Sequence, residues 1–133
     1  MTPMEVRIEI EKVYLAEYNG QFPIAIDNKR LDRPNEDTWV RLNIQFNAGK
    51  QGSFGMTGNR KFLRYGFIYV QVFTPANEGT DDNDILVENS MNLFDGTRIQ
   101  QLWMYNGKVK TVGSDGQFYQ QNAVIEFSFE NIR

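Results

Sequence analysis

The chain lacks both cysteine and histidine, and it has only 4 prolines in 133 residues. Without cysteine there is no disulfide, no thiolate nucleophile and no zinc site of the usual kind. Without histidine the commonest general base is also missing. An enzyme would have to rely on Asp, Glu, Lys or Ser, so these absences weigh against catalysis. The lack of disulfides favours an intracellular or assembly-protected setting.

Long apolar runs are missing as well. Glu5, Glu9 and Glu11 interrupt the amino-terminal segment, so we expect no signal peptide. The longest apolar stretch, within residues 65–73, is too short to span a membrane, so we expect a soluble protein without a membrane partner. A net charge of −3 and a pI near 5.0 weigh against a dedicated nucleic-acid binder, which has to neutralise many phosphates.

The chain is rich instead in apolar and aromatic residues, which make up 41% and 14% of it. These values and the length predict one folded domain over residues 1–133. From Trp39, apolar residues at even positions (Val40 to Phe46) alternate with polar ones, which is typical of a half-buried strand. The next strand, predicted over 64–74, is apolar at almost every position, so we expect both of its faces to be buried.

The segment between these two strands, residues 49–60, contains four glycines and is much longer than an ordinary hairpin turn. Ordering such a loop costs conformational entropy, so we interpret it as an arm that an external partner orders. Its apolar Phe54 and Met56 are surrounded by cations, which is typical of a protein interface. The predicted interface residues are Lys50, Gln51, Phe54, Met56, Asn59, Arg60, Lys61 and Arg64.

The remaining segments predict two helices and further strands. Thr2, Pro3 and Glu5 form a capping box for a helix over about 3–18, and Thr80 is expected to cap a second, well-buried helix that Asp95-Gly96 ends. Residues 22–26 predict an edge strand because of Pro23. Strands are also expected at 98–105, 108–113 and 118–130, the first two joined by an Asn106-Gly107 hairpin turn. The fold class is therefore α+β, with a mostly antiparallel or mixed sheet, an amino-terminal helix, one helix between strands and a long projecting hairpin loop.

The motifs weigh against two ligand sites. The glycine-rich loop lacks the Ser or Thr after Gly49-Lys50 that a phosphate-binding loop requires, and it joins two strands. The acidic group at 81–84 lacks the glycine that a calcium loop requires, and the helix dipole explains its charge. We therefore expect no cofactor, metal or catalytic residue.

An RNA-binding sheet remains an alternative, because Tyr65, Phe67 and Tyr69 share one face of a strand next to Arg64.

Several segments in order resemble the tail terminator family of long-tailed bacteriophages. They are Trp39-Val40-Arg41-Leu42, a loop with Gly and Gln, Tyr65-Gly66 followed by Val70-Gln71-Val72-Phe73-Thr74-Pro75, Glu78-Gly79-Thr80 before a helix, and the closing strand from Phe118 to Phe127. The likeness extends from about Met4 to Arg133.

This resemblance implies a structural, non-enzymatic virion subunit that assembles in the host cytoplasm. Members of the family form a ring, usually a hexamer, at the head-proximal end of the tail, where they cap the tail tube, stop its polymerisation and offer the head-joining surface. The implied partners are other copies of the chain, the tail tube protein and the head–tail connector or neck protein. The loop at 49–60 resembles the projecting hairpin of the family, which meets neighbouring subunits or the tube. The mild negative charge would let DNA pass through the lumen without specific binding.

Two other functions stay open from the sequence. A neck or head-closure subunit of the same particle would share ring assembly, and a small nucleic-acid-binding module would use the aromatic residues at 65–69 and the basic loop.

Overall fold

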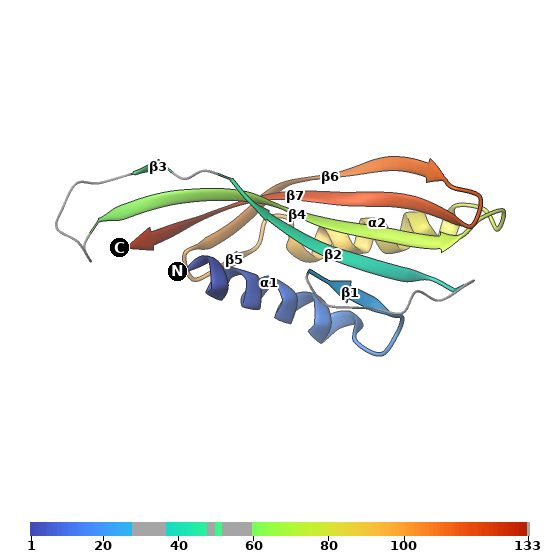
Figure 1. Cartoon of the computed structure of the whole chain (residues 1–133), viewed down its shortest axis with the longest axis horizontal. Helices are drawn as coiled ribbons and strands as arrows, with labels where there is room; N and C mark the ends of the chain where they lie inside the picture. The colour runs from blue at the N-terminus through green and yellow to red at the C-terminus, as the bar shows by residue number, and fades with distance from the viewer. Residues whose placement is uncertain (28–36, 48–49, 52–59, 133) are drawn as a thin grey trace.

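The computed structural model describes residues 1–27, 37–47, 50–51 and 60–132, with only the backbone of 50–51. A seven-stranded sheet has the order β1-β2-β4-β7-β6-β5, with β3 paired to β4, and two helices accompany it (Figure 1). All pairings are antiparallel except β1 with β2. The fold is therefore α+β, as the sequence predicts. The elements are α1 (Pro3–Tyr18), β1 (Ile24–Ile26), β2 (Trp39–Phe46), β3 (Lys50–Gln51), β4 (Lys61–Pro75), α2 (Asp81–Phe94), β5 (Arg98–Ile99), β6 (Leu102–Ser114) and β7 (Phe118–Ile132).

Helix α1 begins and ends where its capping signals place it. The Glu5 backbone N–H donates to Thr2 Oγ1 at 3.2 Å, Pro3 occupies the first turn, and the Asn19 N–H donates to the Leu15 carbonyl at 2.9 Å. The buried residues Val6, Ile10 and Tyr14 recur at the spacing of one helix face. The predicted helix is confirmed.

Helix α2 differs from the prediction in two respects. Thr80 stands at the N-cap position with αR backbone angles, and its side chain makes no capping hydrogen bond, because a capping hydroxyl requires extended backbone at that residue. The helix is also less buried than expected, since Ile85 is 61% exposed. Only one side of the helix is buried, at Asn83, Val87, Ser90 and Phe94.

Both helices cover the same face of the sheet, which we call the inner face. Even-numbered residues of β2 and β4 pair in register there, Val40 with Val72 and Leu42 with Val70, and β7 continues the layer with Ala123 opposite Val70. The helices meet above this layer, where Tyr14 hydroxyl and Ser90 Oγ are hydrogen-bonded at 3.1 Å. One core cluster therefore contains residues of α1, α2 and four strands.

Gly66 in β4 makes room for two aromatic rings of this core. It pairs with Phe46 on one side and with Phe127 on the other, and those two rings meet edge to face at 5.6 Å. A Cβ at Gly66 would lie 2.3 Å from the Gln45 carbonyl oxygen and 2.3 Å from the Phe127 ring. The absence of a side chain at position 66 is therefore a packing requirement.

The predicted Asn106-Gly107 hairpin is wrong. Leu102–Ser114 is one strand, and its pairing with β7 shifts register between Tyr105 and Lys108. Asn106 does adopt positive φ, 53°, but the extra residue forms a bulge within the strand. The Gly107 N–H donates to Asp95 Oδ1 at 3.0 Å, so the bulge is held against the end of α2. The real turns are at 100–101, where Gln100 has a φ of 54°, and at 115–117.

At one end of the molecule, β4 and β7 continue past β2 as a ribbon, with β3 beside β4 (Figure 1). Residues 61–65 of β4 pair with 128–132 of β7. The Met1 ammonium donates to the Glu130 carbonyl oxygen at 2.7 Å, which brings the amino end of the chain to the base of this ribbon. The β4 strand of the ribbon begins directly after the loop predicted at 49–60.

Candidate functional site

The described residues of the predicted interface lie on the ribbon or next to it. Lys50 and Gln51 form β3, which pairs with Leu63 and Phe62 of β4. Phe54, Met56 and Asn59 lie outside the described residues. The structure brings the remaining three, Arg60, Lys61 and Arg64, to the start of β4.

These three cations contact side chains of the ribbon. The Arg60 guanidinium lies 5.9 Å from the Phe62 ring centroid, and Lys61 Nζ lies 3.8 Å from a Glu130 carboxylate oxygen. Arg64 turns to the inner side, over the Phe129 ring at 6.0 Å, and its buried Nε has no hydrogen-bond partner in the part of the chain that the structure describes. A buried guanidinium nitrogen of this kind favours a partner group supplied from elsewhere.

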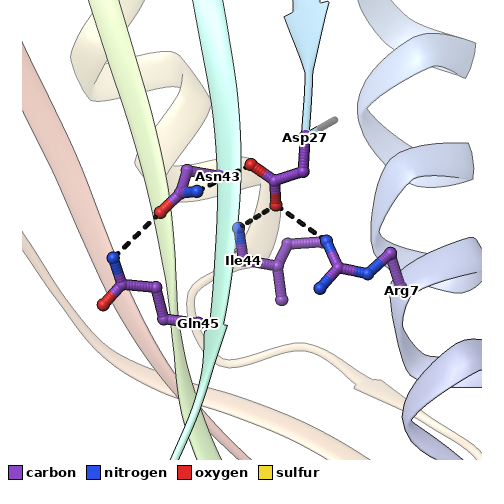
Figure 2. A network of polar contacts seen from close by, with 5 residues as sticks. All are labelled: Arg7, Asp27, Asn43, Ile44 and Gln45. Carbon is purple, nitrogen blue, oxygen red and sulfur yellow. Dashed lines mark hydrogen bonds and ion pairs between the residues drawn. The ribbon is translucent and has the colours of Figure 1, made fainter. Parts of the chain in front are cut away.

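A polar network around Asp27 joins α1 to the open edge of β2 (Figure 2). Asp27 Oδ2 accepts from Arg7 Nη1 at 2.7 Å and from the Ile44 backbone N–H at 2.8 Å, while Oδ1 accepts from Asn43 Nδ2 at 2.6 Å. The strand β1 ends at Ile26, so the carboxylate replaces the carbonyl that a longer β1 would offer to Ile44. The Arg7 guanidinium also lies 5.4 Å from the Phe46 ring, which fixes α1 beside the ribbon end of β2.

The other face of the sheet, which we call the outer face, carries no helix among the described residues. Two strands place aromatic residues there on either side of β7. Trp103 and Tyr65 flank Ser128, and the next row along the sheet has Tyr105 and Phe67 on either side of Glu126. Neighbouring rings contact each other, with centroids 4.8 Å apart for Trp103 and Tyr105 and 6.1 Å apart for Phe67 and Tyr69.

This arrangement corrects the expectation that both faces of β4 are buried. Ile68, Val70 and Val72 are buried on the inner face, whereas Tyr65, Phe67 and Tyr69 on the outer face are only partly buried. At the far end of the outer face, Trp39, Phe73 and Phe118 form a second small cluster in which the first two rings stack at 4.1 Å. These three side chains are buried, whereas the aromatic rows nearer the ribbon are partly exposed.

The outer face is basic although the protein as a whole is acidic. Five exposed cations stand on it by register, against two partly buried acids, Glu126 and Glu130. The two helices, in contrast, carry eight acidic residues and two basic ones. Charge is therefore segregated between the two sides of the molecule. The five cations are Arg41, Lys61, Arg98, Lys108 and Lys110.

Helix α1 has a second apolar surface that faces away from the sheet. Met4 and Ile8 are 68% and 52% exposed, and Leu15 lies one helical repeat further along the same side. A shallow concavity there is lined by Ile8, Glu11, Lys12, Leu15 and Ala16. We call Met4, Ile8 and Leu15 the α1 stripe.

No group of His, Cys, Asp and Glu side chains that could hold a metal ion is found in the described ranges, and neither α1 nor α2 has the length and apolar character to cross a bilayer. Burial raises the pKa of the Tyr14 phenol, and its hydrogen bond with Ser90 opposes that rise only partly. Burial also raises the pKa of Tyr18.

The sequence does not predict the α1 stripe, and it predicts an accessible face with Tyr65, Phe67 and Tyr69 only in the RNA-binding alternative. The signal for the outer face is the polar half of the β2 alternation, because Arg41 and Gln45 stand on the same side as the aromatic residues of β4. The signal for the stripe is an amino-terminal helix with apolar residues on two sides.

A family model described as phage tail terminator protein matches residues 9–126, most of the chain. Among solved structures, one chain that carries no functional name superposes with a TM-score of 0.71 at 15% identity, over 100% of this chain and 99% of that one. At that identity the likeness concerns the fold alone. No curated protein matches the sequence.

Proposed function

Because the chain belongs to the phage tail terminator family, we propose that it is a non-enzymatic virion subunit that caps the head-proximal end of the tail tube. In this function it stops the addition of tube protein and offers the surface to which the head, through its connector or neck protein, is joined. The family match over 9–126 carries this proposal. Because the match covers α2, the second part of α1 and most of the sheet, it links most of the fold, and not one motif, to a structural role in the tail.

The working form is a ring of identical copies, most simply a hexamer around the channel through which DNA passes. A ring needs two different patches on each subunit, which meet around the axis. The segregation of charge between the helices and the outer face, and the exposed apolar residues on each, support this form.

The ribbon is the part that we propose to contact the tail tube or a neighbouring copy. Arg64 supports this assignment, since its buried Nε lacks a hydrogen-bond partner among the described residues. The proposed contact residues are Lys50, Gln51, Phe54, Met56, Asn59, Arg60, Lys61 and Arg64.

The test is electron microscopy of phage particles made without this protein. A terminator predicts overlong tails that lack heads, and complementation by the wild-type chain should restore normal length. Headless tails of normal length would contradict the termination function and favour a neck or head-closure subunit. Free heads and tails that join normally would contradict both.

A second measurement examines the loop predicted at 49–60. Replacing Phe54 and Met56 together with Ser should leave the melting of the monomer nearly unchanged while complementation fails, since substitutions at residues that the sequence predicts to be exposed usually alter stability by less than about 0.5 kcal/mol. If the variant melts as the wild type does and still restores tail length, the segment does not contact the tube; if the variant unfolds, the segment belongs to the core.

A further inference from the structure

Two surfaces of the described molecule expose large apolar side chains to solvent. The α1 stripe exposes Met4 and Ile8, and the outer face exposes Trp103, which is 49% accessible beside Tyr105. Aromatic residues, Met and Leu or Ile side chains concentrated in this way are typical of contact surfaces between proteins. Both surfaces therefore have the composition of an interface.

The two surfaces are electrostatically complementary. Helix α1 has four glutamates against Arg7 and Lys12, and Arg7 is already engaged by Asp27. The outer face offers Lys108 and Lys110 next to its aromatic rows, and both lysines are exposed. A cationic face and an anionic helix attract each other, whereas two outer faces or two α1 helices would repel.

The two surfaces also point in different directions. On α1, the stripe lies on the side opposite Val6, Ile10 and Tyr14, which pack on the inner face of the sheet. The outer face is the opposite side of that same sheet. One molecule can therefore hold a neighbour on each surface at once, which is the condition for head-to-tail association.

We propose that copies of this chain associate head to tail, with the α1 stripe of one copy seated on the outer face of the next between the aromatic rows of β4 and β6. This inference rests on the proposed ring and names the surfaces that build it. Ile8 and Trp103 are the apolar anchors, and Glu11, which lines the concavity of the stripe, faces Lys108 and Lys110.

The test uses two variants, each blocked on one surface. Ile8→Lys places a cation on the stripe, and Trp103→Glu places an anion on the outer face; both positions are half exposed, so the fold should persist with unchanged melting and circular dichroism. Each variant alone should associate about 30-fold or more weakly than wild type in sedimentation experiments, as loss of an interfacial anchor does. Mixing the two should restore association, because each variant keeps one wild-type surface that the other lacks and the two substituted surfaces carry opposite charges.

Ile85→Lys is the matched control, because Ile85 is an equally exposed helical isoleucine on α2. It should assemble as the wild type does. Assembly that survives either blocking variant, a mixture that stays monomeric, or a wild-type chain that remains monomeric up to its solubility limit would overturn the inference.

Cross-linking provides an independent readout, since the chain has no cysteine of its own. A mixture of Ile8→Cys and Lys110→Cys chains treated with a short bis-maleimide should give a covalent dimer, and neither chain alone should do so. Dimers from one variant alone would indicate a symmetric contact and overturn the proposal. Salt-sensitive binding of single-stranded DNA that Trp103→Glu abolishes, without any effect on self-association, would assign the outer face to nucleic acid instead.

The failure of this inference is distinct from failure of the proposed function. If particles without the protein have overlong, headless tails while both blocked variants still form rings, the terminator function stands and these surfaces are wrong. If the surfaces behave as described and tail length is normal without the protein, the ring exists and its function is another one.

Discussion

Arg7 and Asp27 form an ion pair with 2.7 Å between Nη1 and Oδ2, and through it the amino-terminal helix is fastened to the open edge of the sheet. The pair is only partly shielded from solvent, so its Coulomb energy alone is small. Its importance comes from the other two hydrogen bonds of the same carboxylate, to Asn43 and to the Ile44 N–H. The acid therefore satisfies three donors at the point where β1 ends.

Replacing Asp27 with Ala should lower the free energy of unfolding by about 1–3 kcal/mol, because three donors lose their acceptor together. Asp27→Asn should cost less, since one oxygen remains. Glu88→Ala, an exposed acid on α2, is the control and should stay within about 0.5 kcal/mol of wild type. Urea unfolding measures all three, and equal midpoints for Asp27→Ala and the control would show that the network carries no stability.

Gly66 is expected to tolerate no side chain. Gly66→Ala forces a Cβ into the Gln45 carbonyl and the Phe127 ring, so the strand or the ring must move, and we expect a loss of about 1–3 kcal/mol or more. Ser128→Ala, which changes a small residue of the outer face on neighbouring β7, should be close to neutral. Thermal unfolding followed by circular dichroism makes the comparison. If Gly66→Ala leaves the stability unchanged, Phe46 and Phe127 do not pack against Gly66 as described above.

Asn83 fixes the start of α2 to the sheet, since its Nδ2 donates to the Val72 carbonyl, Thr74 Oγ1 and the Tyr119 carbonyl at 3.0–3.1 Å. The side chain is fully buried. Asn83→Asp would replace this donor with a carboxylate facing two carbonyl oxygens, so burial and repulsion should raise the pKa of the new acid.

The Asn83→Asp variant should therefore be strongly destabilised at neutral pH and should recover stability, relative to wild type, as the pH falls and the acid is protonated. Asn89→Asp, an exposed change on the same helix, is the control. Urea midpoints measured across pH decide the matter. If the two variants have the same pH dependence, Asn83 is not the buried donor described above.

Alkaline pH should destabilise the protein through Tyr14. Its pKa is raised above the ordinary tyrosine value by burial, so between about pH 10 and the folded-state pKa the unfolded chain releases a proton that the folded chain keeps. Stability is then lost as the pH rises, by up to about 1.4 kcal/mol per pH unit for this one group.

Tyr14→Phe removes the titrating group and should give a flatter loss of stability above pH 10, after a constant cost of about 1 kcal/mol for the hydrogen bond to Ser90. Tyr18 titrates in the same direction and remains in both proteins. Parallel stability curves for the variant and the wild type would show that Tyr14 ionises equally in the folded and unfolded chains.

Much of this fold could be predicted from local signals. The cap at Thr2, the alternation from Trp39 to Phe46 and the turn at Asp95-Gly96 are determined by residues within a few positions of one another, and each was read correctly. Asn106-Gly107 was misread because positive φ serves a bulge as well as a turn. Only the tertiary contact of Gly107 with Asp95 distinguishes the two.

The candidate surfaces could not be predicted from the sequence, because their exposure depends on packing between segments that are far apart in the chain. Tyr65, Phe67 and Tyr69 were correctly placed on one face, but whether that face is covered depends on where two distant helices pack. The side chains of the predicted interface residues are described for only Arg60, Lys61 and Arg64.

The bulge in β6 has one further consequence. Beyond the two residues that β5 covers, the rim of the sheet from Lys108 to Ser114 meets no other strand within the described ranges. A kinked backbone and two lysines make that rim a poor template for strand addition, which is how natural sheets avoid growing into fibrils. Newly made copies are thus protected from edge-to-edge aggregation along this rim.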